Sequence, residues 1–181
     1  MTSFLLLGII GVAFLLILFK RKPALEGSAA NRKMVHLLSQ APWFQSHWRA
    51  GLFLFVTNAL LFAATLLILY SLLFLNIPYI HLLIMFLAAA FSIRLWLDIK
   101  LAWRGAAKER LKAGLIGSSF YLIIFVIFLY QFASAEPEFP GDDPFMRAIG
   151  FFFGMIVAAT AAISCVAAIG FSSKGHEKRQ I

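Results

Sequence analysis

Apolar residues form five long runs along the chain, and the polar residues gather between them. A helix needs about 20 mostly apolar residues to cross the hydrocarbon of a bilayer. Each run reaches roughly that length once its flanking residues are included. The predicted spans are about 3–19, 51–75, 78–97, 114–133 and 148–171. The pattern predicts an all-α integral membrane protein, with residues 1–181 forming a single membrane domain built as a bundle of five transmembrane helices.

Composition agrees with this pattern. The chain is 62% hydrophobic and 13% charged, whereas a soluble domain is about half apolar and a quarter charged. The first run could instead be a secretory signal peptide, but no Lys or Arg precedes it and no small-residue cleavage pattern follows it. It ends in three basic residues, 20–22, which is typical of a retained anchor. The single cysteine, Cys165, lies in the last run, excludes an intrachain disulfide and is expected to be a packing residue.

The basic residues predict the orientation. The net charge is +8, and 14 of the 16 basic residues lie in the segments after the first, third and fifth spans. These residues are Lys20, Arg21, Lys22, Arg32, Lys33, Arg49, Lys100, Arg104, Lys108, Arg110, Lys112, Lys174, Lys178 and Arg179. Short basic loops stay cytoplasmic, so we expect a multi-pass plasma membrane protein with its N-terminus outside and its C-terminus in the cytoplasm.

The same charges indicate a partner. Each basic residue near an anionic membrane surface contributes roughly 1 kcal/mol, so anionic lipid headgroups on the cytoplasmic side are the expected partner. Nucleic acid is not expected, because the basic residues lie beside the ends of the spans, where the orientation bias already explains them.

The opposite side is acidic. Four carboxylates occur in the loop that precedes the last span, namely Glu136, Glu138, Asp142 and Asp143. Their oxygens could bind a divalent cation, although their spacing matches no EF-hand loop. Charge asymmetry alone also explains them, and the sequence leaves the two interpretations open.

Two cytoplasmic segments are expected to be helical. Ser28 can cap a short amphipathic helix that ends at Pro42 and lies along the inner membrane surface. The aromatic residues Trp43, Phe44 and Trp48 follow it and are expected at headgroup level, as are Trp96 and Trp103 further along. The segment 98–113 should continue the third span as a helix before the chain turns at Gly105 or Gly114.

Several polar residues enter the spans at similar depth near the cytoplasmic side. The set that could form a polar cavity is Asn58, Arg94, Asp98, Ser118, Ser119 and Ser164. Intramembrane ionisable residues usually face the bundle or water, so a functional cavity is one interpretation. The simpler one is that Arg94 extends toward the headgroups and pairs with Asp98 one turn later. Whether Arg94 faces the bundle or lipid is left open.

The last span carries small residues at every fourth position, Gly150, Gly154, Ala158 and Ala162. Small residues at this spacing let helices approach closely in a membrane. This face therefore predicts close packing, with a helix of the same chain, a second copy or another membrane protein.

No motif for catalysis is present: the chain lacks the nucleophile elbow, the zinc-protease histidine pair and the phosphate-binding loop. His36, His47 and His176 are expected on the side opposite His81, so no metal or other cofactor is predicted. The favoured function is a regulatory, assembly or accessory membrane component. The alternative is a small-solute or ion transporter or channel protomer that uses the polar layer around Arg94, and a membrane-embedded enzyme is less well supported.

Overall fold

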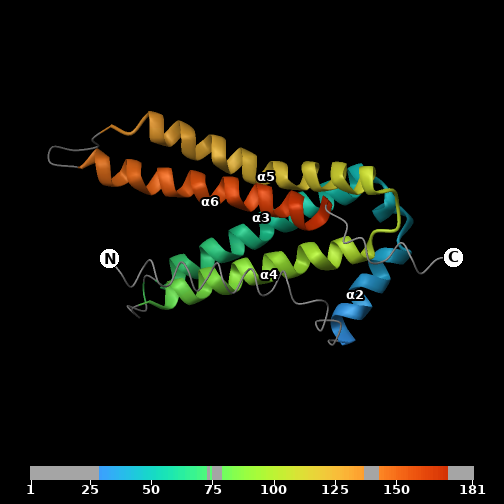
Figure 1. Cartoon of the computed structure of the whole chain (residues 1–181). Helices are drawn as coiled ribbons and strands as arrows, with labels where there is room; N and C mark the ends of the chain where they lie inside the picture. The colour runs from blue at the N-terminus through green and yellow to red at the C-terminus, as the bar shows by residue number, and fades with distance from the viewer. Residues whose placement is uncertain (1–28, 73, 75–78, 137–142, 171–181) are drawn as a thin grey trace.

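The structure is a computed structural model, and it describes residues 29–72, 74, 79–136 and 143–170. Across these residues the chain is helical apart from short connections, and no strand occurs in them. The elements are α2 (Ala29–Gln40), the 3-10 helix η1 (Pro42–Gln45), α3 (His47–Leu72), α4 (Ile80–Ala102), α5 (Ala107–Ala133) and α6 (Pro144–Gly170) (Figure 1). The all-α fold class is therefore confirmed for this part of the chain.

Four helices, α3 to α6, are long and apolar enough to cross a membrane. They coincide with the last four predicted spans, and the first predicted span, residues 3–19, lies outside the described residues. Three of the helices extend beyond their apolar run, because α3 begins at His47, α4 ends at Ala102 and α5 begins at Ala107. A helix that ended inside the hydrocarbon would leave terminal N–H and C=O groups without partners, so the extension into the polar zone is expected.

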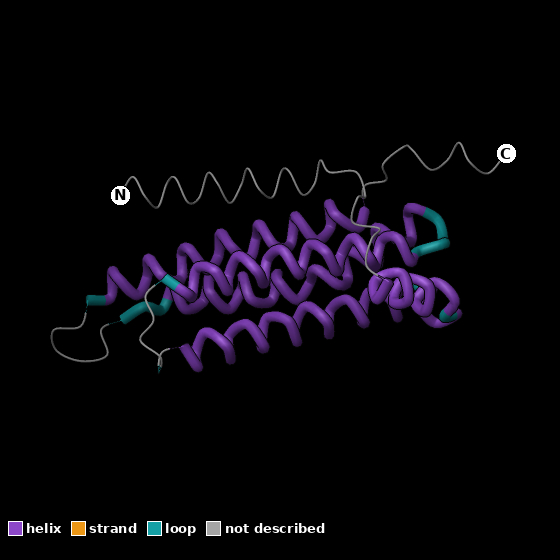
Figure 2. The backbone as a smooth tube through the Cα atoms, turned by 90° about the horizontal axis from the view of Figure 1, so that it is seen from below, coloured by secondary structure: helices purple, strands orange, loops and turns teal. Residues whose placement is uncertain are grey.

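The helix ends gather at two opposite ends of the bundle. The first, here called the basic end, contains α2, η1, the start of α3, the α4–α5 turn and the end of α6 (Figure 1). The second, the acidic end, contains the ends of α3 and α5 and the starts of α4 and α6. The view from below shows the long helices running along a common direction (Figure 2). Described basic residues such as Arg49 and Lys108 therefore lie at one end, and Glu136 and Asp143 at the other.

Helix α5 packs most extensively against α6 and α3. Glycines permit the close approach of α3 to α5. A Cβ added at Gly51 would lie 2.7 Å from Cβ of Ile116, and one added at Gly117 would overlap the side chain of Leu54. Without a hydrophobic driving force between helices in lipid, such close packing is a main source of association.

The buried core lies in the half of the bundle nearest the basic end. Buried positions stop at Asn58 in α3 and at Ser118 in α5, and they begin only at Ile93 in α4. Only α6 has a buried face that extends further, from Met155 to Ile169. The other halves of α3, α4 and α5 contain no fully buried residue among those described.

The turn between α4 and α5 lies at Gly105, and the alternative at Gly114 is wrong. Trp103 folds back over the turn, where its Nε1–H donates to the carbonyl oxygen of Ala106 at 3.3 Å. A Cβ at Gly105 would lie 3.1 Å from that ring nitrogen, so the covered turn favours glycine. Gly114 is instead a helical residue of α5 that packs against Ile169.

The predicted amphipathic helix corresponds to α2, and η1 follows it with Pro42 in its first turn. Phe44 was expected at headgroup level with Trp43 and Trp48, but it is fully buried. Its ring packs edge-on against Phe53 and Trp103. The expectation was wrong because η1 turns this ring inward, whereas Trp43 in η1 and Trp48 in α3 are exposed.

Gln45 joins η1 to the α4–α5 turn. Its Oε1 accepts a hydrogen bond from the backbone N–H of Arg104 at 3.0 Å, and its Nε2 donates to the carbonyl oxygen of Ala102 at 3.4 Å. The guanidinium of Arg104 also donates to Oγ of Ser39 in α2 at 3.3 Å. The two bonds of Gln45 thus pair the last carbonyl oxygen of α4 and a backbone N–H of the following turn.

Candidate functional site

One buried asparagine connects all four long helices. Asn58 of α3 has no exposed surface. Its Oδ1 accepts a hydrogen bond from Nε1–H of Trp96 in α4 at 2.9 Å, and its Nδ2 donates to the carbonyl oxygen of Gly117 in α5 at 3.2 Å. The same Nδ2 lies 3.9 Å from Sγ of Cys165 in α6. These four residues are here called the Asn58 junction.

The local sequence explains why this junction forms. Gly117 has no side chain, so α3 can approach α5 at Leu54, the residue one turn before Asn58. The close approach brings the amide of Asn58 within hydrogen-bond distance of the Gly117 carbonyl. A carbonyl oxygen has two lone pairs, so it can accept this bond in addition to its bond within α5.

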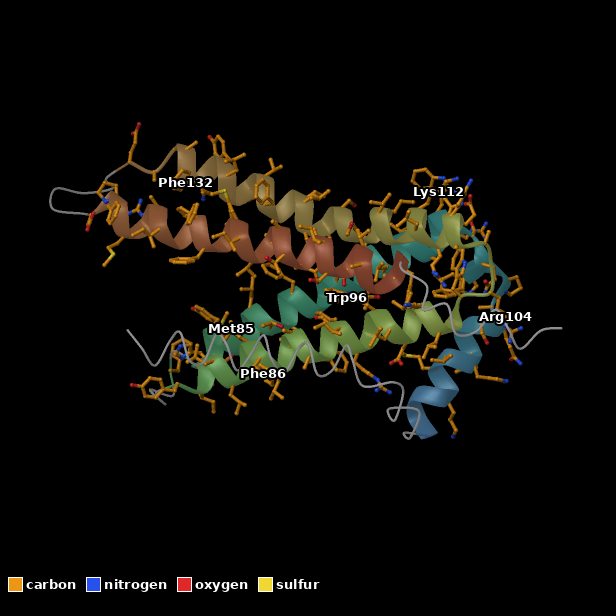
Figure 3. All side chains as sticks on the ribbon, viewed as in Figure 1. Met85, Phe86, Trp96, Arg104, Lys112 and Phe132 are labelled. Atoms are coloured by element: carbon orange, nitrogen blue, oxygen red, sulfur yellow. The ribbon has the colours of Figure 1, made fainter. Side chains whose placement is uncertain are left out.

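Trp96 closes the junction from the side of α4. It is buried, and Figure 3 shows it reaching from α4 toward α3. Its ring packs edge-on against Tyr121 of α5, with the ring centroids 6.2 Å apart. The expectation that Trp96 faces the headgroups was wrong, because its indole N–H finds its partner inside the bundle. Trp103 was expected there too and is also buried, against Phe44.

The serines of the predicted polar layer bond within their own helix. Ser118 is buried, and its hydroxyl donates to the carbonyl oxygen of Leu115 at 3.0 Å. Ser119 donates in the same way to Ile116 at 2.6 Å. Ser164 is half-buried and directly precedes Cys165 in α6. The hydroxyl groups of Ser118 and Ser119 therefore donate their hydrogen bonds within α5, next to the junction, and not to another helix.

Arg94 and Asp98 lie apart from the junction. The Nε of Arg94 is 3.6 Å from Oδ2 of Asp98, whose side chain is only 5% exposed against 25% for Arg94. Residues two positions apart on a helix differ by about 200° in direction, so both residues lie on the face of α4 opposite Trp96. The helix therefore divides the predicted layer into a junction on one face and an ion pair on the other.

The small residues of α6 pack within the chain. Ala158 and Ala162 are buried, and a Cβ at Gly154 would lie 2.8 Å from Cδ2 of Phe128 in α5. Gly150 differs, because a Cβ there would meet nothing within 4 Å. At Gly154, therefore, α6 packs closely against α5 of the same chain.

A second polar cluster joins the first turns of α3 and α5 at the basic end. Nδ1 of His47 lies 2.6 Å from Oε2 of Glu109, and Nζ of Lys112 lies 2.8 Å from Oε1 of the same carboxylate. The hydrogen bond from Lys112 is the main reason that the pKa of Glu109 lies below its usual value. These side chains are partly exposed, and exposed ion pairs contribute little stability.

The described residues do not form a metal site. No group of three or more His, Cys, Asp or Glu side chains among them is placed to hold a metal ion. His36 contacts Gln40, and His81 lies at the opposite end of the bundle from His47. In the acidic loop, Oδ1 of Asp143 accepts from the backbone N–H of Phe145 at 3.0 Å and so caps α6. His176, Glu138 and Asp142 lie outside the described residues.

The sequence pattern indicates Asn58 and Ser118 but not the partners that give the junction its geometry. The pattern predicts Trp96 at the interface and Cys165 as a packing residue, and it indicates neither the contact of Gly117 nor the ring contact of Tyr121. One signal was available: a buried indole N–H needs an acceptor, and Asn58 is the one amide side chain deep within the spans.

No protein-family model, curated protein or solved structure matches the chain.

Proposed function

We propose that this protein is a non-enzymatic regulatory, assembly or accessory component of the plasma membrane. The observation that supports the proposal is the Asn58 junction. A transport pathway needs polar groups that can meet solute or water, whereas the carboxamide of Asn58 is occupied by α4 and α5 and contacts α6. The most deeply buried polar side chain of α3 therefore holds the helices together by hydrogen bonds and is not available to a solute.

The proposed orientation has the N-terminus outside and the C-terminus in the cytoplasm. Support comes from the placement of the described charges, because the basic end contains α2, the α4–α5 turn and the end of α6. Arg110, at this end, donates to the carbonyl oxygen of Gly170 at 3.3 Å and so complements the negative end of α6. A C-terminal fluorescent reporter should be active inside the cell, and a C-terminal alkaline phosphatase should be inactive. The reverse result would overturn the orientation.

One observation favours the transporter alternative. Asp98 is a nearly buried carboxylate paired with Arg94 in the last turns of α4, and charged groups inside membranes commonly mark solute or ion pathways. In that case Arg94 would attract an anionic solute.

Reconstitution separates the two functions. The full chain would be placed in liposomes, and the flux of chloride, inorganic phosphate and potassium would be measured beside Arg94→Leu. An accessory component should give the flux of protein-free liposomes in both cases. In native membranes it should also purify with another integral membrane protein at a fixed ratio. Flux through the chain alone that Arg94→Leu abolishes would overturn the proposal and establish the alternative.

A further inference from the structure

The half of α4 nearest the acidic end contains no buried residue. From Tyr79 to Ser92 no residue is buried, and exposed and half-buried positions alternate along the whole stretch. A helix at the edge of a bundle normally buries one face and turns the other to lipid. Here the side of α4 that faces the bundle is not buried either.

The buried residues of α4, from Ile93 to Ala102, all lie in its other half. Trp96 reaches Asn58 and Tyr121, and Trp103 reaches Phe44. By contrast, α5 and α6 stay together near the acidic end, where Phe128 and Phe132 of α5 pack against aromatic rings of α6. The half of α4 from Tyr79 to Ser92 is therefore a surface that the described helices leave without a buried residue.

Small side chains make this surface suitable for another helix. Residues 88–90 are alanines and residue 92 is serine, and Ala89 is exposed. Small residues let helix backbones approach closely, and such contacts drive association in lipid. Met85 and Leu87, 48% and 54% exposed, add larger apolar side chains on either side.

The chain itself contains a segment of matching length. Residues 4–19 form an apolar run with glycines at positions 8 and 11, and 28 residues precede α2. As a helix the run would be about 25 Å long. Only residues 20–28 separate it from α2, so its cytoplasmic end can lie at most about 30 Å from Ala29. Among the spanning helices, α2 makes its main contacts with α4.

We propose that residues 4–19 form a transmembrane helix that packs against the half of α4 between Tyr79 and Ser92. The short linker favours this occupant over a second copy, because a tether of this length holds the segment near α4 at a millimolar effective concentration. The glycines at positions 8 and 11 then oppose Ala88 and Ala89. This inference concerns the assembly of the chain and does not depend on the proposed function.

Disulfide trapping tests the proposal in the full chain, reconstituted in liposomes. Cys165→Ser removes the native thiol and keeps a hydrogen-bond acceptor for Asn58. Gly11→Cys is then combined with Ala89→Cys, or with Val126→Cys as the matched control. Val126 is 59% exposed and lies at similar depth in α5.

The readout follows from the methionine positions. Cyanogen bromide cleaves after Met34, Met85 and Met146 and places residues 89 and 126 in the same fragment, separate from residue 11. After mild oxidation, the Ala89→Cys pair should link the two fragments within one chain at least about tenfold faster than the control, because helix packing holds only this pair of thiols within disulfide distance.

Two results would overturn the proposal. A link that appears only in dimers would show that a second copy covers α4. Equal rates for Ala89→Cys and Val126→Cys would show that lipid covers it. Loss of the fold is recognised separately, because misfolded protein would form links at both positions and would elute as aggregate.

Discussion

Asn58→Leu is expected to weaken the bundle at the junction. Leucine has nearly the same size, so the substitution removes hydrogen bonds without opening a large cavity. Two bonds between helices are lost, from Nε1–H of Trp96 and to the carbonyl oxygen of Gly117. Bonds of this kind within membranes contribute about 0.6 kcal/mol on average and about 1.7 kcal/mol at most. The free energy of unfolding should therefore fall by about 1–3 kcal/mol, which changes the equilibrium constant about 5- to 150-fold.

Steric trapping in lipid bicelles measures this free energy for a membrane protein. Thr57→Val is the matched control, because Oγ1 of Thr57 donates to the carbonyl oxygen of Phe53 within α3 and joins no other helix. Its effect should stay within about 0.5 kcal/mol.

A double-mutant cycle then isolates the bond to Trp96. Trp96→Phe removes the N–H donor, and its effect should be smaller in the Asn58→Leu background by about 0.6–1.7 kcal/mol. Independent effects of the two substitutions, or an Asn58→Leu protein as stable as Thr57→Val, would refute the account of the junction.

Three further predictions follow from the packing and the charges. Gly117→Ala should destabilise the protein because the added methyl overlaps Leu54, and Leu54→Ala in the same protein should partly restore its stability. Gly150→Ala should have little effect because nothing lies within 4 Å of the added methyl. Thermal unfolding compares the three proteins. Gln45→Ala should speed hydrogen exchange at the Arg104 amide about tenfold by removing its acceptor at 3.0 Å, and unchanged exchange would contradict the proposed bond. The pKa of Glu109 is lowered in the fold. Its contribution to the free energy of unfolding is therefore present above the unfolded pKa of about 4.3 and is lost as the pH falls through the lower folded pKa. Thermal melts of Glu109→Gln at decreasing pH should lack this loss of stability.

The helical class and the limits of the last four spans could be predicted from the sequence. The transfer of apolar residues into hydrocarbon depends on composition and run length, and neither needs a partner helix. The predicted limits differ from the observed ones by up to seven residues, as at the start of α5. These differences arise because a helix continues until its terminal backbone groups find partners, and the apolar run does not show where that occurs.

The partners of each helix could not be predicted in the same way. Apolar residues cover every face of α3, α4 and α5 over most of their length, so periodicity does not show which face meets a neighbour. The sequence placed Asn58, Arg94 and Ser119 at a similar depth, but depth does not specify direction around a helix.

The sequence alone determined that the described chain consists of long apolar helices separated by charged segments, because these properties follow from how each residue interacts with its solvent. Only the tertiary structure decided that Asn58 bonds to Trp96 and Gly117, whereas Arg94 and Asp98 pair on the opposite face of α4. That choice depends on the rotation of each helix, and close contacts such as Gly117 against Leu54 determine that rotation. Gly117 and Leu54 are more than 60 positions apart in the chain, so no local pattern reveals their contact.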